Sequence, residues 1–470
     1  MATTLTADTG TTGTAHTAGG RWAALVLLVS AQFVVMLDTS IVNVALPSIQ
    51  ADLGLRPTAL TWVVNAYVLA FGGLLLLSGR AADLFGRRLF VGGSVLFAAG
   101  TLLAASASSA TTLVGGRVVQ GIGAAALSPA ALSLLLLTFG GQDRARAMGV
   151  WGAASALGGA AGVMTGGLLV GAFGWPSVFL VTVPVSVAAV ALAGRFLSEG
   201  ARRNRRRFDW LGAATITGAV VALVRGALGI ADHGWTSPTV IAALTASGAL
   251  AAVSIVIERR AADPLLPLEL FRSRPLTTGV GLAVLGGAAR ASTFVLIALY
   301  LQQALTMAPM QAGLAMVPTS LTGFAFSLTL LPRIVRVHGP QRSLVAGLVV
   351  LATGHLWLAN APTASGYLTA VLPGLLLVAV GVALSFTPTT MVIAGAVPDT
   401  HTGLASGLAG SATQVGAALG TATFTAIGFS VNGPLGHTLG ASGFSAAFTA
   451  AAAVALATAV LGTTIARARH

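Results

Sequence analysis

The strongest constraint on this chain is a series of long apolar runs. A run of roughly 18 to 25 apolar residues can cross a lipid bilayer as a helix. The composition agrees, because 55% of the 470 residues are hydrophobic, only 8% are charged and the mean hydropathy is +0.89. We predict an all-α membrane protein with fourteen spans at approximately 23-46, 59-79, 89-108, 111-136, 145-170, 177-197, 210-229, 239-257, 276-301, 310-331, 342-360, 366-390, 403-428 and 443-465.

The positions of the basic residues fix the expected orientation. All 25 are arginine; twenty-one fall in loops and tails on one side, against Arg56 alone on the other. Because basic loops stay in the cytoplasm, we predict a multi-pass protein of the cell membrane with both termini cytoplasmic. The arginines lie between spans rather than on one face of a domain, so the net charge of +13 does not indicate nucleic-acid binding. The lack of lysine, with abundant Ala and Gly, is typical of a GC-rich bacterium.

The loops suggest an internal duplication. We expect a disordered cytoplasmic tail at 1-20, a six-helix bundle at 21-207, an inserted two-helix linker at 208-263 and a second six-helix bundle at 264-470. Duplicated units are the usual construction of secondary transporters. The segment GRAADLFGRR at 79-88 is faintly similar to LPRIVRVHGPQR at 331-342, with Gly86 matching Gly339.

Asp38 is the one acid deep within a predicted span. An ionised Asp at the bilayer centre costs about 2.5 to 3.5 kcal/mol on insertion scales, so it normally faces a protein interior or a watery cavity. Asp38 is either a helix cap or ion-pair partner, or a site that takes up and releases a proton. Arg117, in the fourth span, is its candidate partner.

Glycines repeat at a spacing of four in two spans at matched positions of the two blocks. The fifth span carries Gly158, Gly162 and Gly166, and the thirteenth carries Gly403 with Gly407 and Gly416 with Gly420. Such stripes allow helices to approach closely in lipid. One interpretation is ordinary helix packing; their matched positions favour a moving interface between the two halves.

Several motifs together resemble one family. LDTSIVNVALP at 37-47, WVVNAYVLAFGGLLLLSGRAADLFGRR at 62-88, LVGGRVVQGIGAA at 113-125 and GLASGLAGSATQVGAALGTA at 403-422 follow in order. The chain resembles the fourteen-span drug:proton antiporters of the major facilitator superfamily. The resemblance implies the major facilitator fold and a role for Arg117 in proton coupling. The fifth span has Gly159-Ala160 and Gly162-Val163 where the family's antiporter motif usually has Gly-Pro pairs.

The resemblance also implies a gating loop after the second span. Its residues are Gly79, Asp83, Gly86, Arg87 and Arg88, and in the family this loop holds the cytoplasmic side closed. Gly79 would permit close helix contact, and Asp83 can accept hydrogen bonds from the N-terminus of a facing helix. A purely topogenic role would explain the two arginines but not Asp83 or the glycines.

Evidence for the substrate is thin in the sequence. Because the spans contain few acidic residues, the sequence favours a neutral, zwitterionic or anionic amphiphile over a dication. Arg225 can snorkel to the membrane surface, whereas Arg290 lies in mid-span. His355 is a second candidate proton carrier, although a lone buried His is more often satisfied by a neighbour. Candidate cavity residues, each individually more typical of structural hydrogen bonding, are Asn43, Trp62, Asn65, Tyr67, Gln120, Arg290, Gln302, Gln303 and Gln414.

Three functions remain open at this point. A proton-coupled exporter of a drug, antibiotic or secondary metabolite, working by alternating access as a monomer, accounts for Asp38, Arg117 and the gating loop together. An uptake carrier of the same superfamily would share nearly all of these features. A membrane-embedded enzyme would need a cluster of His, Asp or Glu, which the scattered histidines do not form. No cysteine is present, which excludes thiolate metal sites, and we expect no metal or cofactor.

Overall fold

The protein is a bundle of long helices. The computed structural model describes residues 18–197, 209–261, 264, 266–361, 366–431 and 440–467, and within them every regular element is helical. There, 14 helical segments are long and apolar enough to cross a membrane, which confirms the predicted spans. The main helices are α1 (Ala18–Leu53), α2 (Pro57–Phe85), α3 (Arg87–Ala105), α4 (Ala110–Thr138), α5 (Gly141–Phe173), α6 (Ser177–Leu180), α7 (Val183–Phe196), α8 (Trp210–His233), α9 (Pro238–Arg260), α10 (Arg274–Leu299), α11 (Pro309–Ala315), α12 (Val317–Thr329), α13 (Leu331–Ala359), α14 (Leu372–Ala394), α15 (Thr402–Val431) and α16 (Ala441–Arg467).

The predicted limits need a few adjustments. The sixth span consists of α6 and α7, and the tenth of α11 and α12. Pro184 and Pro318 lie in the first turns of α7 and α12, where a missing backbone N–H needs no helical partner. Residues 1–17 of the predicted tail lie outside the described residues, and α1 already begins at Ala18. The predicted domain boundary at 207/208 lies within, and that at 263/264 at the edge of, segments that are not described.

The helix at the eleventh span differs most from the prediction. It was expected at 342-360, but α13 begins at Leu331 and is broken at Gly339, which has φ 77° and ψ 162°. Gly86, between α2 and α3, also has a positive φ, 45°. L-residues with side chains rarely adopt such angles. The glycine pair matched in the sequence therefore interrupts the helix at corresponding places in the two blocks.

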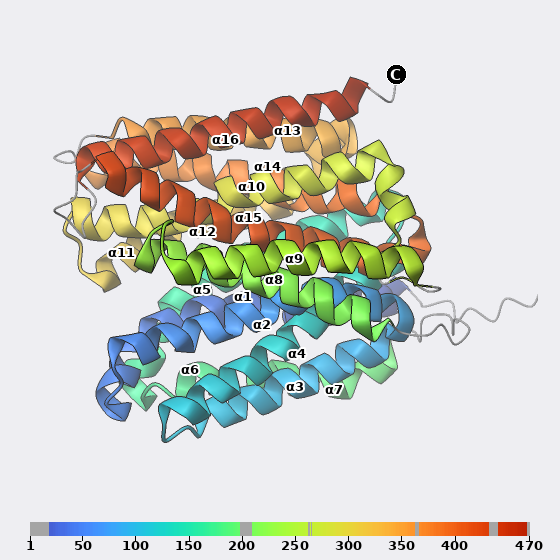
Figure 1. Ribbon diagram of the computed structural model, residues 1–470, viewed down its shortest axis with the longest axis horizontal. Coiled ribbons are helices and arrows are strands. Elements are labelled where there is room, and N and C mark those ends of the chain that lie inside the picture. Colours follow the sequence, from blue (N-terminus) through green and yellow to red (C-terminus); the bar gives the residue numbers. More distant parts are fainter. Residues whose placement is uncertain are drawn as a thin grey trace, which may run out of the picture.

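The helices form two groups that face each other (Figure 1). Helices α1 to α7 pack largely among themselves, with α1 against α4 and α5, and α2 and α3 against α4. Helices α10 to α16 form the second group, with α10 against α15 and α16, and α13 against α14 and α16. Both seams between the groups are made by helices from each: α2 meets α15, and α5 meets α12.

The inserted helices α8 and α9 cover one of these seams. They run antiparallel to each other across the front of the molecule in Figure 1, and α8 contacts both α2 and α15. A methyl group at Gly73 of α2 would lie 2.3 Å from Cγ2 of Val221 in α8. The missing side chain at Gly73 is thus what lets α8 lie directly on α2.

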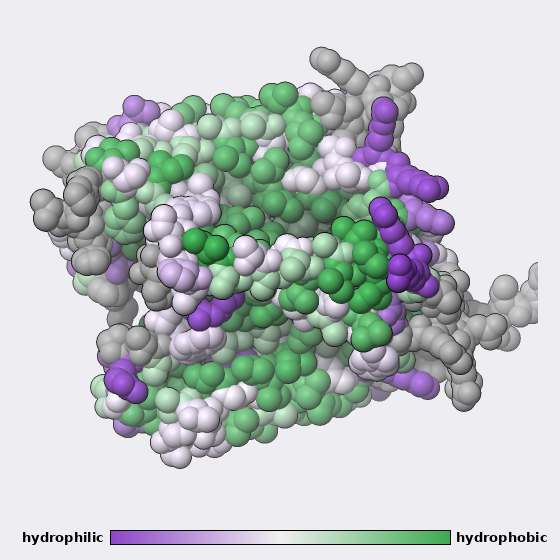
Figure 2. Space-filling view, in the orientation of Figure 1, coloured by the Kyte–Doolittle hydropathy of each residue, from purple (hydrophilic) through white to green (hydrophobic). Residues whose placement is uncertain are grey.

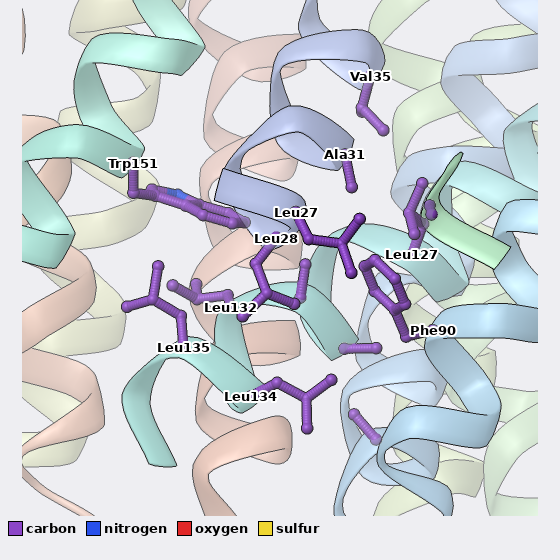
Figure 3. Close-up of a cluster of buried hydrophobic side chains, with 14 of the residues drawn as sticks. Leu27, Leu28, Ala31, Val35, Phe90, Leu127, Leu132, Leu134, Leu135 and Trp151 are labelled. Carbon is purple, nitrogen blue, oxygen red and sulfur yellow. The ribbon is translucent and has the colours of Figure 1, made fainter. Parts of the chain in front are cut away.

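Apolar packing fills the first group of helices. Leu28, Ala31 and Val35 of α1 meet Leu127 and leucines nearby in α4, together with Phe90 of α3 and Trp151 of α5 (Figure 3). In lipid the burial of apolar area between helices does not itself drive association, so close van der Waals contact carries the packing. This core positions α1 and α4, which hold the charged pair described below.

The charges concentrate at one end of the bundle. Apolar residues cover the middle of the face shown in Figure 2, and most hydrophilic ones gather where α9 ends and α10 begins. We call this the arginine-rich end, because the helix ends there carry Arg87, Arg144, Arg195, Arg259, Arg274 and Arg333. Helices α1, α5 and α15 all begin at this end.

The glycine stripes of the fifth and thirteenth spans hold helices together within each group. Methyl groups at Gly158 and Gly162 would lie within 2.6 Å and 2.1 Å of α1 atoms, and Gly166 also faces α1. Gly416 and Gly420 face α10, at 1.9 Å and 2.5 Å. The expectation that these five glycines form the interface between the halves is therefore wrong. They pack α5 on α1 and α15 on α10, the same pair of positions in each block.

Candidate functional site

Asp38 and Arg117 form a buried ion pair. Nη1 of Arg117 in α4 donates to Oδ2 of Asp38 in α1 across 2.7 Å, and the two residues are 1% and 0% exposed. Among the described residues, Asp38 is the one carboxylate that is completely inaccessible. Removing one partner of such a pair leaves an uncompensated buried charge, which is strongly destabilising. The pair predicted from sequence thus exists.

Neutral groups from three helices complete the hydrogen bonds of this pair. Nε2 of Gln120 donates to Oδ1 of Asp38 at 2.7 Å and to Oγ1 of Thr101 in α3 at 3.0 Å, and its Oε1 accepts from Nη1 of Arg117 at 2.6 Å. Nε of Arg117 donates to the carbonyl oxygen of Val63 in α2 at 3.0 Å. The guanidinium also lies over the ring of Tyr67, with 4.2 Å from Cζ to the centroid. Arg117 therefore has three interactions that do not depend on the charge of Asp38: with the carbonyl of Val63, the side-chain amide of Gln120 and the ring of Tyr67.

Asp83 joins the two groups of helices at the arginine-rich end. Its Oδ1 accepts a hydrogen bond from the backbone N–H of Gly403 at 2.6 Å, and its Oδ2 accepts one from Leu404 at 2.9 Å. These are free N–H groups of the first turn of α15, where the helix dipole favours a negative charge. The predicted bond from a facing helix N-terminus is present, and its donor is α15.

Glycines make this contact close enough for hydrogen bonding. A methyl group at Gly79 would lie 2.5 Å from the carbonyl oxygen of Gly403 and 2.7 Å from Cα of Gly407. On the second seam, a methyl group at Gly149 of α5 would lie 2.6 Å from Cγ of Pro332 in α13. The two halves are therefore in contact on both seams at the arginine-rich end. Gly403 and Gly407 belong to this interface, as the sequence suggested.

The rest of the predicted gating loop lies beside this contact. Gly86 ends α2 with its positive φ, which turns the chain directly into α3. Nη1 of Arg87 donates to the carbonyl oxygen of Leu197 at 3.0 Å, while Arg88 is exposed. Arg87 thus ties the loop to the end of α7, and Arg88 faces the surroundings of the bundle.

A cavity of about 670 Å³ lies between the two groups of helices. Drug-sized ligands occupy pockets of roughly 300 to 1,000 Å³. Its lining comes from α1 and α5 on one side and from α10, α11, α12, α14 and α15 on the other, and is mostly apolar. It begins at Gly152 and Thr387, just beyond the closed contacts, and reaches Leu299 and Gly313 toward the opposite end. The protein is thus closed at the arginine-rich end and hollow beyond it.

Three of the nine predicted cavity residues line this cavity: Asn43, Arg290 and Gln414. Tyr67 and Gln120 belong to the Asp38 cluster instead, behind the cavity wall. Trp62 lies outside the lining, with Cζ of Arg225 5.3 Å from its ring centroid. Asn65, Gln302 and Gln303 are not part of the lining either. Residue type identified polar groups within spans but not the helix face on which they lie.

The hydroxyl and aromatic residues that line the cavity were not predicted from the sequence. They are Thr39, Ser40, Ser155, Phe294, Thr319, Ser320, Ser327, Phe386, Thr387 and Thr413. Thr39 and Ser40 directly follow Asp38 on α1, which was the one available signal, since neighbours of a functional residue turn toward the adjoining faces of the helix. Serine and threonine are otherwise too frequent in membrane helices to be distinctive.

His355 lies apart from both the cavity and the Asp38 cluster. It is fully buried in α13, its Nε2 is 2.5 Å from Oγ1 of Thr293 in α10, and its ring stacks on Phe448 of α16. Its Nδ1 has no hydrogen-bond partner among the described residues. The described residues contain no group of three or more His, Cys, Asp or Glu side chains placed to bind a metal ion.

Comparison with known proteins agrees with this architecture. Residues 28–421 match the model of the Major Facilitator Superfamily. The chain is 38% identical to the cephamycin export protein CmcT of Amycolatopsis lactamdurans, over 88% of this chain and 85% of that protein. It is 37% identical to the puromycin resistance protein of Streptomyces alboniger, over 85% and 80%.

Solved structures share the fold at low identity. The human organic anion transporter MFSD10 matches with a TM-score of 0.67 and 17% identity, covering 94% of this chain and 99% of that one. The proton:xylose symporter XylE matches with a TM-score of 0.66 and 15% identity, covering 95% of each. With its two groups of helices around a central cavity and this family match, the chain belongs to the Major Facilitator Superfamily and is a multi-pass membrane transporter rather than an enzyme.

Proposed function

We propose that this protein exports a small amphiphilic compound of the antibiotic or secondary-metabolite class, by alternating access, driven by proton entry through Asp38. The buried pair of Asp38 and Arg117 carries the proposal. Ionisable residues inside membrane helices are energetically costly, and where they occur they commonly mark pathways for protons, ions or substrates. Relatives named for cephamycin export and for resistance to puromycin support the direction and the compound class.

The position of Asp38 suggests how a proton and a substrate act on each other. Asp38 faces α4, whereas Thr39, Ser40 and Asn43 of the same helix line the cavity. The two ligands therefore need not compete for one place. Protonation of Asp38 would weaken the bond between α1 and α4, and a shift of α1 would change the cavity wall. Arg117 would stay held by Val63 and Gln120.

The closed end supports a cycle with two states. With the arginine-rich end in the cytoplasm, the structure corresponds to an outward-facing state held by Asp83 on α15. The opposite state requires those bonds to break and the contacts of Gly79 with Gly403 to separate. A ligand shifts such an equilibrium only through its different affinity for the two states, which both the proton and the exported compound would supply.

The test is gradient-driven accumulation in proteoliposomes with an imposed pH gradient. The panel is cephamycin, puromycin, lincomycin and tetracenomycin C, compounds in the names of relatives. Asp38→Asn should abolish uphill transport and retain binding. Asp143→Asn, which removes a half-exposed carboxylate paired with Arg21 at 3.6 Å, is the matched control and should transport normally. Equal accumulation by wild type and Asp38→Asn would remove Asp38 from the coupling and turn attention to His355.

A further inference from the structure

Arg290 brings an unpaired positive charge into the cavity. It lies on α10, is 3% exposed, and is the one charged residue in the cavity lining. Its Nε, Nη1 and Nη2 have no hydrogen-bond partner among the described residues. Its Cζ lies 5.9 Å from the ring centroid of Phe386 in α14.

This arrangement contrasts with that of Arg117. Both arginines are buried in spans, yet Arg117 has a carboxylate, an amide and a carbonyl as partners. A guanidinium carries five N–H donors and keeps its charge in proteins, and a buried charge is strongly unfavourable unless it is paired. The lining contains no Asp or Glu that could pair with Arg290. The missing partner therefore has to come from outside the chain.

A second polar group without a partner lines the same cavity. Thr319 of α12 is 3% exposed and lines the cavity, and its Oγ1 also lacks a hydrogen-bond partner among the described residues. A hydroxyl can donate to an anion. Arginine and a hydroxyl on different helices form a set of donors, and no acceptor with a negative charge accompanies them in the lining.

We propose that Arg290, assisted by Thr319, binds the carboxylate of an organic anion, so that the transported compound is an anionic amphiphile. This inference rests on the proposed function, because it names the class of compound that the cavity takes. A methyl group at Gly286 would lie 2.6 Å from Nη1 of Arg290, so the guanidinium folds back along α10 toward the closed end. The carboxylate binds at that depth, and the apolar body of the compound lies toward Phe294 and Val295, nearer the opposite end.

Three dansyl compounds with one fluorophore and different charges test the proposal. Dansylglycine is an anion, dansylglycinamide is neutral and dansylcadaverine is a cation. Their binding to the purified full-length protein in detergent is measured by fluorescence titration. We expect the wild type to bind the anion at least about 10-fold more tightly than the amide, as one charge-assisted contact allows, and to bind the cation most weakly.

Substitutions assign the preference to one side chain. Arg290→Gln should reduce the preference for the anion over the amide to within about 2-fold, and Arg290→Lys should keep part of it, because a point charge replaces the fork of the guanidinium. Arg225→Gln is the matched control, since this exposed arginine lies over Trp62 and outside the cavity. An unchanged preference in Arg290→Gln, or no preference in the wild type, overturns the proposal.

Two further measurements separate this proposal from its alternatives. Without ligand, Arg290→Gln should melt at the same temperature as the wild type or higher, because it removes an uncompensated buried charge; a strongly lowered melting temperature would indicate a structural role instead and would contradict the proposal. If proteoliposomes show no gradient-driven transport while the preference for the anion holds, the proposed proton coupling fails and the anion site stands. If transport occurs with no preference for the anion, only the anion site fails.

Discussion

Asp83 and Gly403 are 320 residues apart in the sequence, and a hydrogen bond of 2.6 Å joins them across the two halves of the protein. The carboxylate bonds to two consecutive N–H groups of α15. In the proposed alternating-access cycle, this contact would form while the arginine-rich end is closed and break when that end opens.

Weakening this contact should shift the protein toward the state in which the arginine-rich end is open. In Asp83→Asn the charge is lost, and a charge-assisted hydrogen bond contributes roughly 1.5 to 3 kcal/mol. The chain has no cysteine, so nitroxide labels can be placed cleanly at Phe85→Cys and Val337→Cys, two exposed positions at this end of opposite halves. Electron spin resonance should show a longer distance between the labels in Asp83→Asn, and transport should slow. An unchanged distance distribution would contradict this role for Asp83.

The close approach of α2 and α15 should tolerate no side chain. Gly79→Ala would place a methyl group 2.5 Å from the carbonyl oxygen of Gly403. It should separate the two helices and reduce transport severalfold, with the same lengthening between the labels. Gly115→Ala in α4 is the control, since a methyl group there meets nothing within 4 Å. If both variants transport equally well, close contact at Gly79 is not needed for the cycle.

The buried ion pair predicts that a double substitution recovers stability without function. Asp38→Asn leaves Arg117 without its carboxylate, which typically costs about 3 to 5 kcal/mol for a buried pair, so its melting temperature in detergent should fall. Asp38→Asn combined with Arg117→Gln removes both charges and should melt closer to the wild type. Gradient-driven transport should stay absent in both. A double variant as unstable as the single one would show that the pair is not the source of the loss.

Added side chains should destabilise α5 only on the face that packs against α1. Gly162→Ala would place a methyl group 2.1 Å from Oγ of Ser40 and 2.7 Å from the carbonyl oxygen of Leu37. Overpacking of this kind costs about 1 to 3 kcal/mol, and the melting temperature should fall. Gly159→Ala on the same helix meets nothing within 4 Å and should melt at or above the wild-type temperature. Equal melting temperatures would mean that α1 and α5 adjust freely.

The orientation in the membrane remains a prediction from the arginine distribution. Reporter fusions after Arg205 and after Gly234 should indicate cytoplasm and exterior respectively, because an even number of spans precedes the first site and an odd number the second. A reporter that is active only in the periplasm, paired with one active only in the cytoplasm, distinguishes the two. The same compartment at both sites would refute the seventh span.

The sequence allowed the spans to be located because hydropathy and length depend on composition alone. The predicted limit was wrong at the start of α13. There Arg333, Arg336 and Pro340 interrupt the apolar run, although the chain is helical on both sides of Gly339. Charged groups in apolar surroundings were equally accessible to prediction: Asp38 with Arg117, and Asp83 with a helix N-terminus.

The sequence could not show which face of a helix each residue occupies. The stripe of Gly158 and Gly162 was expected between the halves, but close helix packing needs the same residues within a half. Trp62 was expected in the cavity and lies under Arg225 of α8 instead. In both cases the neighbour is fixed by tertiary packing, and the periodicity of one helix does not contain that information.

The inserted helices make the two flanks of the transporter unequal toward the lipid. Helix α8 lies on Gly73 and spans from α2 to α15, so one seam between the halves is covered by the chain itself. The other seam, between α5 and α12, has no such cover among the described helices, and both of these helices line the cavity. A lateral opening of the cavity to the bilayer would therefore have to form between α5 and α12, because α8 covers the opposite flank.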